Sequence, residues 1–192
     1  MTKLGRPRSE QARQAVLDAG LRLCARDGYA AVTMKGIADA AGVGRQTVYR
    51  WWPSKADVLL EALRELAHTT VSRMALSGDA LDDVRTILDT TFRMLRDVTG
   101  NAISGLMADA QHDPDLSERL QATVIGPRRD ALRDVIEGGI ASGQLARNLE
   151  PALVVDLVFG PMWYRLLSHH APVDDALAAD LVDVVARLLR RP

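Results

Sequence analysis

Apolar side chains recur every three or four positions along most of the chain, which is the spacing of one face of an α-helix. The strict alternation of apolar and polar residues that marks a half-buried β-strand does not occur. Glycine, proline and N-capping residues interrupt the helical pattern at intervals. The pattern therefore predicts an all-α fold of about nine helices, at residues 9–27, 33–41, 45–51, 54–76, 79–98, 101–112, 114–142, 151–169 and 174–190.

The second and third predicted helices are short and are separated by the tripeptide Gly42-Val43-Gly44. Two glycines around one apolar residue suit a tight turn, because glycine reaches positive φ without a Cβ clash. Thr33 is expected to cap the first helix, since its hydroxyl can accept a hydrogen bond from a free N–H group. Pro53 ends the second helix. This stretch predicts a helix-turn-helix.

The second helix of this pair is rich in polar side chains suited to contacts with DNA. They are Arg45, Gln46, Thr47, Tyr49 and Arg50. Arginine pairs with guanine, glutamine with adenine and the threonine methyl with thymine, while tyrosine reaches phosphate. A two-turn helix with so many donors has little reason to belong to a core, and we interpret it as a recognition helix.

The charge of the 192-residue chain is divided between its two parts, although the formal net charge is only −1. Residues 1–55 contain ten Lys and Arg against four Asp and Glu, which leaves fourteen against twenty-one in the remainder. A basic N-terminal part joined to an acidic body is typical of a nucleic-acid-binding protein with a separate regulatory or assembly region.

The stretch from Val16 to Leu63 resembles the DNA-binding domain of the TetR family of bacterial transcriptional regulators. The matching positions are Ala19, Leu23, Gly28, Tyr29, Thr33, Ile37, Ala38, Ala41, Gly42, Val43, Thr47, Tyr49, Trp52, Lys55 and Leu59. Two positions depart from the family pattern: Cys24 stands where Phe is usual, and Gly44 where a capping Ser is common. Beyond this stretch the resemblance thins.

The resemblance implies a helix-turn-helix DNA-binding domain of three helices at residues 1–53, with Tyr29 packed beneath the motif and Trp52 in its core. Residues 54–192 would form a helical bundle for ligand binding and dimerisation. The implied partner is a double-stranded DNA operator. The expected DNA-binding residues are Arg6, Arg8, Thr33, Lys35, Gly44, Arg45, Gln46, Thr47, Tyr49, Arg50 and Lys55.

Two basic features flank the motif. Arg6 and Arg8 lie in a polar arm, and arginine in such an arm favours a narrow, A·T-rich minor groove. A solvated tail is the alternative. Lys55 stands at the start of a predicted helix, where a cation opposes the helix dipole. Because a DNA phosphate would reverse that unfavourable interaction, we assign Lys55 to the DNA backbone.

The last two predicted helices are more apolar than the surface of a monomer allows. The resemblance implies that they form a four-helix interface in a homodimer; full burial within one chain is the alternative. A two-fold dimer would bind a palindromic operator, and a repressor is expected. The candidate interface residues are Leu157, Pro161, Tyr164, Leu177, Leu181, Val184 and Leu188.

The resemblance further implies that the bundle encloses a small apolar or amphipathic effector. The candidate lining residues are Phe92, Met94, Leu95, Met107, His112 and Trp163. Methionine and aromatic residues at helical spacing equally fit ordinary core packing. A DNA-binding protein without a ligand, or a helical protein-interaction bundle, therefore remains an alternative.

Enzymatic function finds little support in the sequence. The four histidines include no pair at the spacing of a helix-face metal site, and no glycine-rich phosphate loop follows a strand. We therefore predict no catalytic residue, metal or cofactor. The single cysteine, Cys24, excludes an intramolecular disulfide and is expected to be buried. The polar, basic N-terminus and the lack of a bilayer-length apolar run predict a cytoplasmic protein without a membrane partner.

Overall fold

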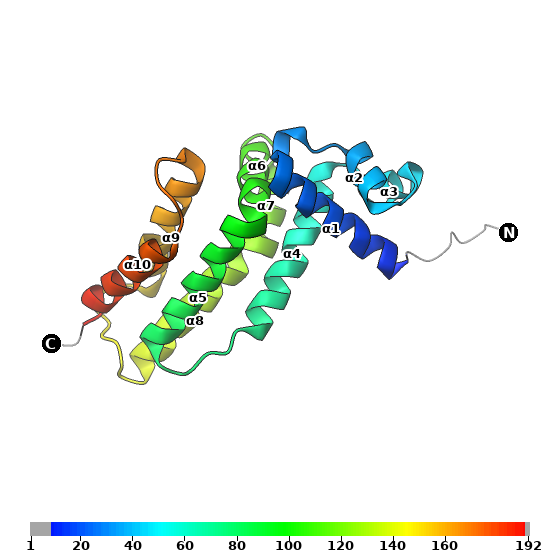
Figure 1. Ribbon diagram of the computed structural model, residues 1–192. Coiled ribbons are helices and arrows are strands. Elements are labelled where there is room, and N and C mark those ends of the chain that lie inside the picture. The colour runs from blue at the N-terminus through cyan, green and yellow to red at the C-terminus, as the bar shows by residue number, and fades with distance from the viewer. Residues whose placement is uncertain (1–8, 191–192) are drawn as a thin grey trace.

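The computed structural model describes residues 9–190, which form ten α-helices and no strand (Figure 1). The all-α prediction is confirmed. One predicted helix, at residues 114–142, is divided into α7 and α8. The helices are α1 (Glu10–Asp27), α2 (Met34–Ala41), α3 (Arg45–Trp51), α4 (Lys55–Arg73), α5 (Ala80–Met94), α6 (Gly100–Ala110), α7 (Pro114–Leu120), α8 (Gly126–Ala141), α9 (Pro151–Ser168) and α10 (Asp175–Leu188).

Side-chain caps stabilise the starts of six helices. A reciprocal pair begins α4: the Ser54 hydroxyl accepts from the Asp57 N–H at 3.2 Å, and the Asp57 carboxylate accepts from the Ser54 N–H at 3.1 Å. These contacts span at most three residues, so the local sequence is sufficient to predict them. First-turn N–H groups of α1, α2, α5, α7 and α10 are likewise bound by the side chains of Ser9, Thr33, Asp79, Asp113 and Asp174.

A buried carboxylate orders the loop between α4 and α5. Asp83 is 5% exposed and accepts hydrogen bonds from the Ser77 N–H at 2.6 Å, the Ser77 hydroxyl at 2.9 Å and the Gly78 N–H at 3.0 Å. Burial alone would raise the pKa of Asp83, but these bonds to its charged form keep that pKa below its ordinary value. The ionised carboxylate therefore holds the loop.

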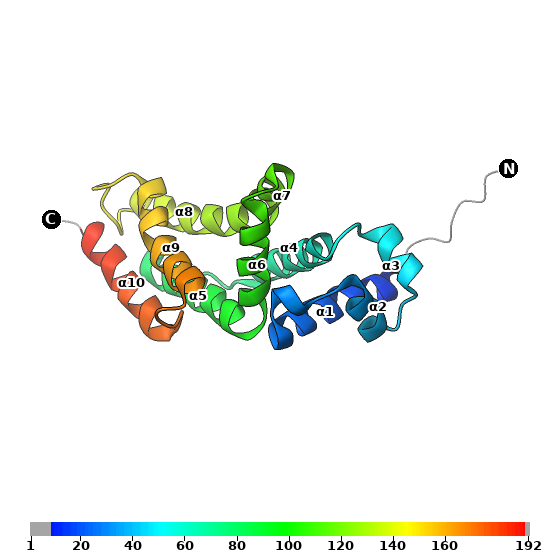
Figure 2. The same cartoon turned by 90° about the horizontal axis from the view of Figure 1, so that it is seen from above.

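Two π-helical turns join consecutive helices. The first, η2 (Leu95–Thr99), connects α5 to α6, and the second, η3 (Gln121–Ile125), connects α7 to α8. The sequence predicts a break at Thr99-Gly100; the structure shows instead a wide turn after which α6 crosses the end of α5 (Figure 2). A Cβ at Gly100 would lie 2.5 Å from the Leu95 carbonyl oxygen, so this turn requires glycine.

The N-terminal head is built on α1, which packs against α2 and α4. It lies at one end of the molecule (Figures 1 and 2). Cys24 is buried as predicted, and burial raises the pKa of its thiol, so it acts as a packing residue. The buried side chains at the centre of the head are those of Val16, Leu17, Cys24, Ile37, Val48 and Trp52.

An ion-pair cluster ties α1 to α4. The Arg13 guanidinium, 12% exposed, bonds Glu10 on its own helix and both Glu61 and Glu65 on α4, with 2.6 Å to Glu61. The hydrogen bonds that Arg13 donates to Glu10 and to the two α4 carboxylates raise the pKa of Arg13 above its ordinary value. Glu61 also accepts the indole N–H of Trp52 at 2.7 Å, which fixes α4 against the end of α3.

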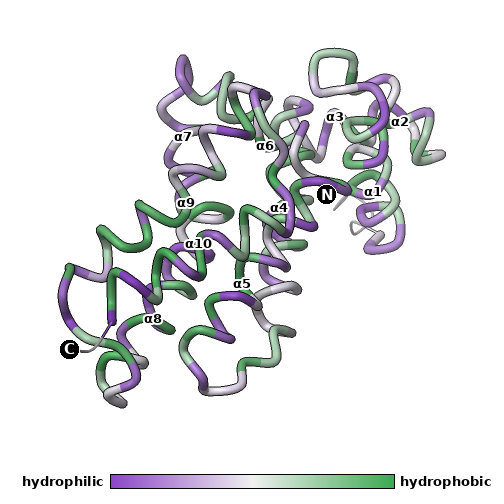
Figure 3. The backbone as a smooth tube through the Cα atoms, turned by 60° about the vertical axis from the view of Figure 1, so that its left-hand side comes forward, coloured by the Kyte–Doolittle hydropathy of each residue, from purple (hydrophilic) through white to green (hydrophobic). Residues whose placement is uncertain are grey.

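The C-terminal body is a bundle in which α5 packs against α8 and α10, and α8 also packs against α4 and α9. Helices α9 and α10 form the end of the molecule opposite the head (Figure 1). Figure 3 shows that α9 is hydrophobic along most of its length. Among the described residues, none of the helices combines the length and apolar character that a membrane crossing needs.

The head contacts the body through Tyr29, in the short turn η1 (Tyr29–Ala31) that follows α1. Its ring packs against Gly105 of α6, where an added Cβ would come within 2.0 Å of Tyr29 Cγ. Its hydroxyl donates to Asp109 at 2.5 Å. Beside it, the Asn101 amide donates to the Cys24 carbonyl oxygen at 3.1 Å. The prediction that Tyr29 packs beneath the helix-turn-helix is therefore corrected: the ring joins the head to α6.

Candidate nucleic-acid interface and internal pocket

A tight turn fixes the angle between α2 and α3. Gly42 has φ 65° and ψ 27°, the left-handed conformation that glycine favours. The N–H of Val43 donates to the Ala38 carbonyl oxygen at 3.1 Å and closes the turn. Gly44 has φ −58°, so only the first of the two glycines needs positive φ, and α3 begins without a side-chain cap.

Helix α3 buries one side and exposes the other. Val48 is fully buried and Trp52, just beyond the helix, is 2% exposed, so these two side chains anchor α3 to the head. The exposed residues are Arg45, Gln46, Tyr49 and Arg50. Arg45 lies 3.4 Å from the Asp39 carboxylate, an exposed ion pair of little strength. A row of polar side chains thus faces solvent from a rigidly held helix.

The other predicted DNA-binding residues surround this face or lie outside the described part of the chain. The Thr33 hydroxyl accepts the Gly36 N–H at 3.0 Å, and its own O–H can still donate to a phosphate. Arg6 and Arg8 lie outside the described residues. Lys35 and Gly44 are exposed, and Thr47 is half-buried.

Lys55 has a partner within the chain. Its ammonium donates to the Tyr29 carbonyl oxygen at 2.8 Å and lies 4.3 Å from the centroid of the Tyr29 ring. These two contacts compensate for the unfavourable position of a cation at the start of α4, which the sequence analysis explained by a DNA phosphate. The ammonium keeps further N–H donors, so a phosphate contact stays a prediction.

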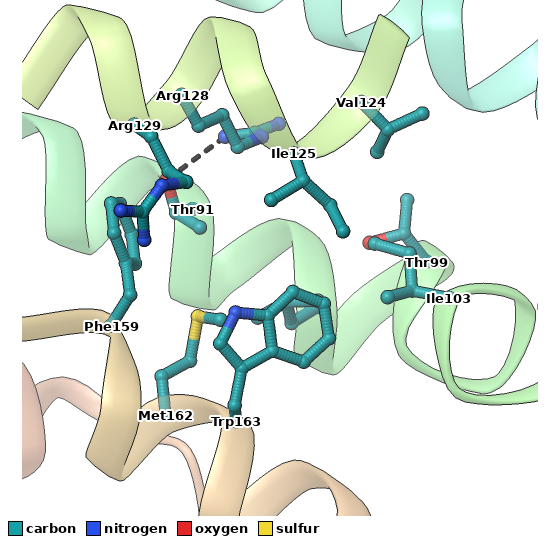
Figure 4. A pocket seen from close by; sticks show the side chains of 11 residues that line it. Thr91, Thr99, Ile103, Val124, Ile125, Arg128, Arg129, Phe159, Met162 and Trp163 are labelled. Atoms are coloured by element: carbon teal, nitrogen blue, oxygen red, sulfur yellow. Dashed lines mark hydrogen bonds between the residues drawn. The ribbon is translucent and has the colours of Figure 1, made fainter. Parts of the chain in front are cut away.

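An internal pocket lies within the body, between α5, α6, α8 and α9 (Figure 4). Its cavity measures about 40 Å³. Both π turns contribute to its wall, which is apolar apart from two threonines and two arginines. A concave, mostly apolar site with a few polar groups suits a small-molecule ligand. The lining residues are Thr91, Leu95, Thr99, Ile103, Val124, Ile125, Arg128, Arg129, Phe159, Met162 and Trp163.

The two arginines of the pocket differ in their partners. Arg129 pairs with the Asp156 carboxylate of α9 at 2.5 Å. Arg128 donates to the Thr91 hydroxyl at 2.9 Å and lies 3.2 Å from the Met94 sulfur, and no carboxylate among residues 9–190 forms an ion pair with it. Burial lowers the pKa of Arg128. The pocket therefore contains a cation whose charge the described residues do not compensate.

Two protein-family models match this chain and together cover most of it. Residues 16–62 match the model of bacterial regulatory proteins of the tetR family, and residues 74–185 match that of the tetracyclin repressor-like C-terminal domain. The chain belongs to the TetR family. It is thus a DNA-binding transcriptional regulator, and the homologues are named as regulators rather than enzymes.

Individual transcriptional regulators are similar to this chain over nearly its whole length. The uncharacterized regulator YdeS of Bacillus subtilis (strain 168) is 34% identical over 183 residues, 94% of this chain and 91% of YdeS. FadR from Bacillus subtilis, solved in complex with stearoyl-CoA, has a TM-score of 0.72 at 19% identity, covering 92% of this chain and 97% of FadR. A regulator from Saccharomonospora viridis, solved with choline, has a TM-score of 0.77 at 20% identity, covering 96% and 100%.

The pocket of this TetR-family protein differs from the one predicted. Of the six predicted lining residues, only Leu95 and Trp163 line it. Phe92 is fully buried in the core outside the pocket, and the Met94 sulfur contacts Thr70 and Arg128. Met107 is half-buried and His112 is exposed, both away from the cavity. The assignment of these four residues to the pocket wall is corrected.

Arg128 was not among the predicted lining residues, because an arginine on an amphipathic helix ordinarily faces solvent. The irregular Gly126-Pro127 step directly before it was the available signal, since a turn of that kind rotates the following residues away from their expected face. Within the part of the chain that the structure describes, no group of three or more His, Cys, Asp and Glu side chains could hold a metal ion.

Four exposed apolar side chains lie on one face of α9 of this TetR-family protein, and α10 exposes a fifth; together they are called the apolar stripe. Pro161 and Leu188 of the predicted dimer interface are half-buried beside it. Leu177 and Leu181 are only 4% and 5% exposed and belong to the protomer's own core, so their assignment to the interface was wrong. The stripe residues are Leu153 (48% exposed), Leu157 (43%), Tyr164 (67%), Leu167 (47%) and Val184 (39%).

Proposed function

We propose that this TetR-family protein is a homodimeric repressor that binds a palindromic DNA operator and leaves it when a small apolar or amphipathic effector occupies the pocket. The observation that carries the proposal is the exposed polar face of α3, at the opposite end of the molecule from the apolar stripe on α9 and α10 (Figure 1). DNA and a second chain can therefore be bound at the same time.

The DNA-binding part of the proposal assigns base readout to α3. Arg45 and Gln46, in the first turn, would contact base edges, while Tyr49 and Arg50 would contact the backbone. The exposed side chains around α3 leave room for the sugar-phosphate chains on both sides. Residues 1–53 would form the DNA-binding domain and residues 54–192 the ligand-binding and dimerisation domain. Because the operator would lie on the bacterial chromosome, we expect the protein to act in the cytoplasm.

The dimer part of the proposal rests on the apolar stripe. Single exposed apolar residues are ordinary, but a row of four along one helix face usually marks an interaction surface. Pairing the stripe with its two-fold copy would form a four-helix interface and bury it. The two α3 helices would then contact half-sites about one helical turn apart, 34–36 Å or a multiple of it, which makes the operator palindromic.

The effector part of the proposal follows from α6, which touches both the pocket and the head. Ile103 lines the pocket, while Asn101 and Gly105 on the same helix contact the α1 end and the Tyr29 ring. An effector that widens the pocket would displace α6 and reorient the head. To release DNA, the effector must bind the released state more tightly than the DNA-bound state.

Selection of bound sequences from a random duplex library tests the proposal. An enriched palindrome is the expected result. Arg45→Ala should weaken binding by about 1–3 kcal/mol and relax the preference at one base pair in each half-site. Arg147→Ala is the matched control, because this exposed arginine lies in the loop before α9. Salt-sensitive binding to any duplex without enrichment would reject sequence-specific recognition.

A further inference from the structure

Most of the partly buried arginines that the structure describes have a carboxylate partner; Arg128 and Arg165, which donates to the Pro172 carbonyl oxygen, do not, and of these two only Arg128 lines the pocket. Arg13 pairs with three glutamates, Arg119 with Asp57, and Arg129 with Asp156. Within residues 9–190, the hydrogen-bond partners of the Arg128 guanidinium are neutral: a threonine hydroxyl and a methionine sulfur. Removing a charge from water without a counter-charge is unfavourable. Such a group is retained where a ligand can supply the opposite charge.

The pocket has a polar and an apolar side. Figure 4 shows the Arg128 and Arg129 side chains at one side of the cavity and those of Thr99 and Ile103 at the other. Apolar side chains lie between them, and no acidic residue belongs to the lining. The ligand that matches this wall has one anionic end and an apolar remainder.

We propose that the pocket binds an apolar carboxylic acid, such as a medium-chain fatty acid, with its carboxylate on Arg128 and its tail directed toward Ile103. This ligand class rests on the proposed effector function. An arginine can hold a carboxylate through two parallel N–H···O bonds. The fold alone leaves the ligand's charge open, since the two solved relatives hold stearoyl-CoA and choline. The wall offers no carboxylate to a cationic ligand.

The size of the cavity links binding to movement. The cavity of about 40 Å³ has room for only a few water-sized groups, so a tail that enters it fully would push the wall apart. The wall opposite Arg128 is Thr99 of η2 and Ile103 of α6. Because the acid group is fixed at one side, a longer tail presses further on α6, which carries the contacts with Tyr29. DNA affinity should therefore fall as the bound tail becomes longer.

Calorimetric titration of the full-length protein with three ligands built on ten-carbon chains tests the proposal. The probes are decanoate, decanol and decyltrimethylammonium, each below its micelle concentration. The variants are Arg128→Leu, which removes the charge and keeps an apolar side chain, and Arg128→Lys, which keeps the charge. Arg133→Leu is the matched control, because Arg133 lies on the exposed side of the same helix. Circular dichroism checks that each variant is folded.

The expected result is that decanoate binds the wild-type protein about 10- to 100-fold more tightly than decanol, the range for one charge-assisted pair. Arg128→Leu should remove this difference, Arg128→Lys should keep part of it, and Arg133→Leu should leave it unchanged. Equal binding of decanoate and decanol, preference for the cation, or binding of none of the three would each overturn the proposal. Tighter binding of decanoyl-CoA that is insensitive to Arg128→Leu would overturn it as well.

A parallel assay with operator DNA separates the ligand class from the proposed function. If decanoate binds through Arg128 but does not release DNA, the ligand class stands and the effector role fails. If DNA is released by decanol or the cation and not by decanoate, the effector role stands and the carboxylate assignment is wrong.

Discussion

The contact between Tyr29 and Gly105 gives the most direct test of how the head is held on the body. A Cβ at Gly105 would lie 2.0 Å from Cγ, 2.4 Å from Cδ1 and 2.5 Å from Cβ of Tyr29. Rotation of the ring cannot relieve the contact with Cβ, because that atom lies on the χ1 axis. The hydroxyl is also held by Asp109 and the ring lies beneath Lys55. Gly105→Ala must therefore push α6 away from the head.

The cost can be worked out from these contacts. Overpacking a tight site costs about 1–3 kcal/mol, and losing the Tyr29–Asp109 hydrogen bond to a charged acceptor adds about 1.5–3 kcal/mol. The better helix propensity of alanine offsets about 1 kcal/mol. We expect a net loss of about 1.5–5 kcal/mol, which lowers the melting temperature by roughly 3–20 °C for a chain of this size.

Thermal and urea unfolding of Gly105→Ala measure this loss, and Gly138→Ala is the matched control. Gly138 also lies in a helix, but an added Cβ there meets nothing within 4 Å. That control should be unchanged or more stable by up to about 1 kcal/mol. If Gly105→Ala were as stable as the control and bound DNA normally, α6 would not pack on Tyr29 as described and the proposed route to the head would fail.

Three further predictions concern the dimer, the loop and the DNA backbone. Leu157→Lys should dissociate the dimer, as measured by sedimentation. The control Leu76→Lys, at a similarly exposed leucine before α5, should leave the dimer intact. An intact Leu157→Lys dimer would show that the apolar stripe is not the dimer interface. Asp83→Asn should lower the free energy of unfolding by about 1–2 kcal/mol at neutral pH. The pKa of Asp83 is lowered in the folded state, so the stability difference between wild type and Asp83→Asn should be largest above the unfolded-state pKa, near 4. It should disappear as the pH falls through the folded-state pKa. A stability difference that stays constant with pH would refute the role of the charge. If Lys55 contacts a DNA phosphate, Lys55→Ala should reduce the slope of log affinity against log salt concentration by about 1. An unchanged slope together with lower thermal stability would show that Lys55 acts only through its contact with Tyr29.

Local interactions made much of the head predictable from sequence. Thr33, Ser54 and Asp113 cap helices through contacts three residues away, so neighbouring residues alone determine where those helices begin. The burial of Val48 and the exposure of Tyr49 follow from the period of one short helix. The recognition helix, its polar face and the family resemblance were therefore accessible without coordinates.

Contacts between distant segments decided the rest. Leu181 and Val184 lie on the same apolar helix, and only its packing against α5 determines that the first is buried and the second exposed. From the sequence, the Tyr29 ring could pack either beneath the helix-turn-helix or against another helix. Gly105, far along the chain, leaves the space that the ring occupies on α6. The pocket depends on two π turns that change which face α6 and α8 present, so hydrophobic periodicity pointed to Met107 of α6 and not to Arg128 of α8. A helical pattern in the sequence specifies which face of a helix a side chain lies on. Which other helix, cavity or solvent that face meets depends on the tertiary structure.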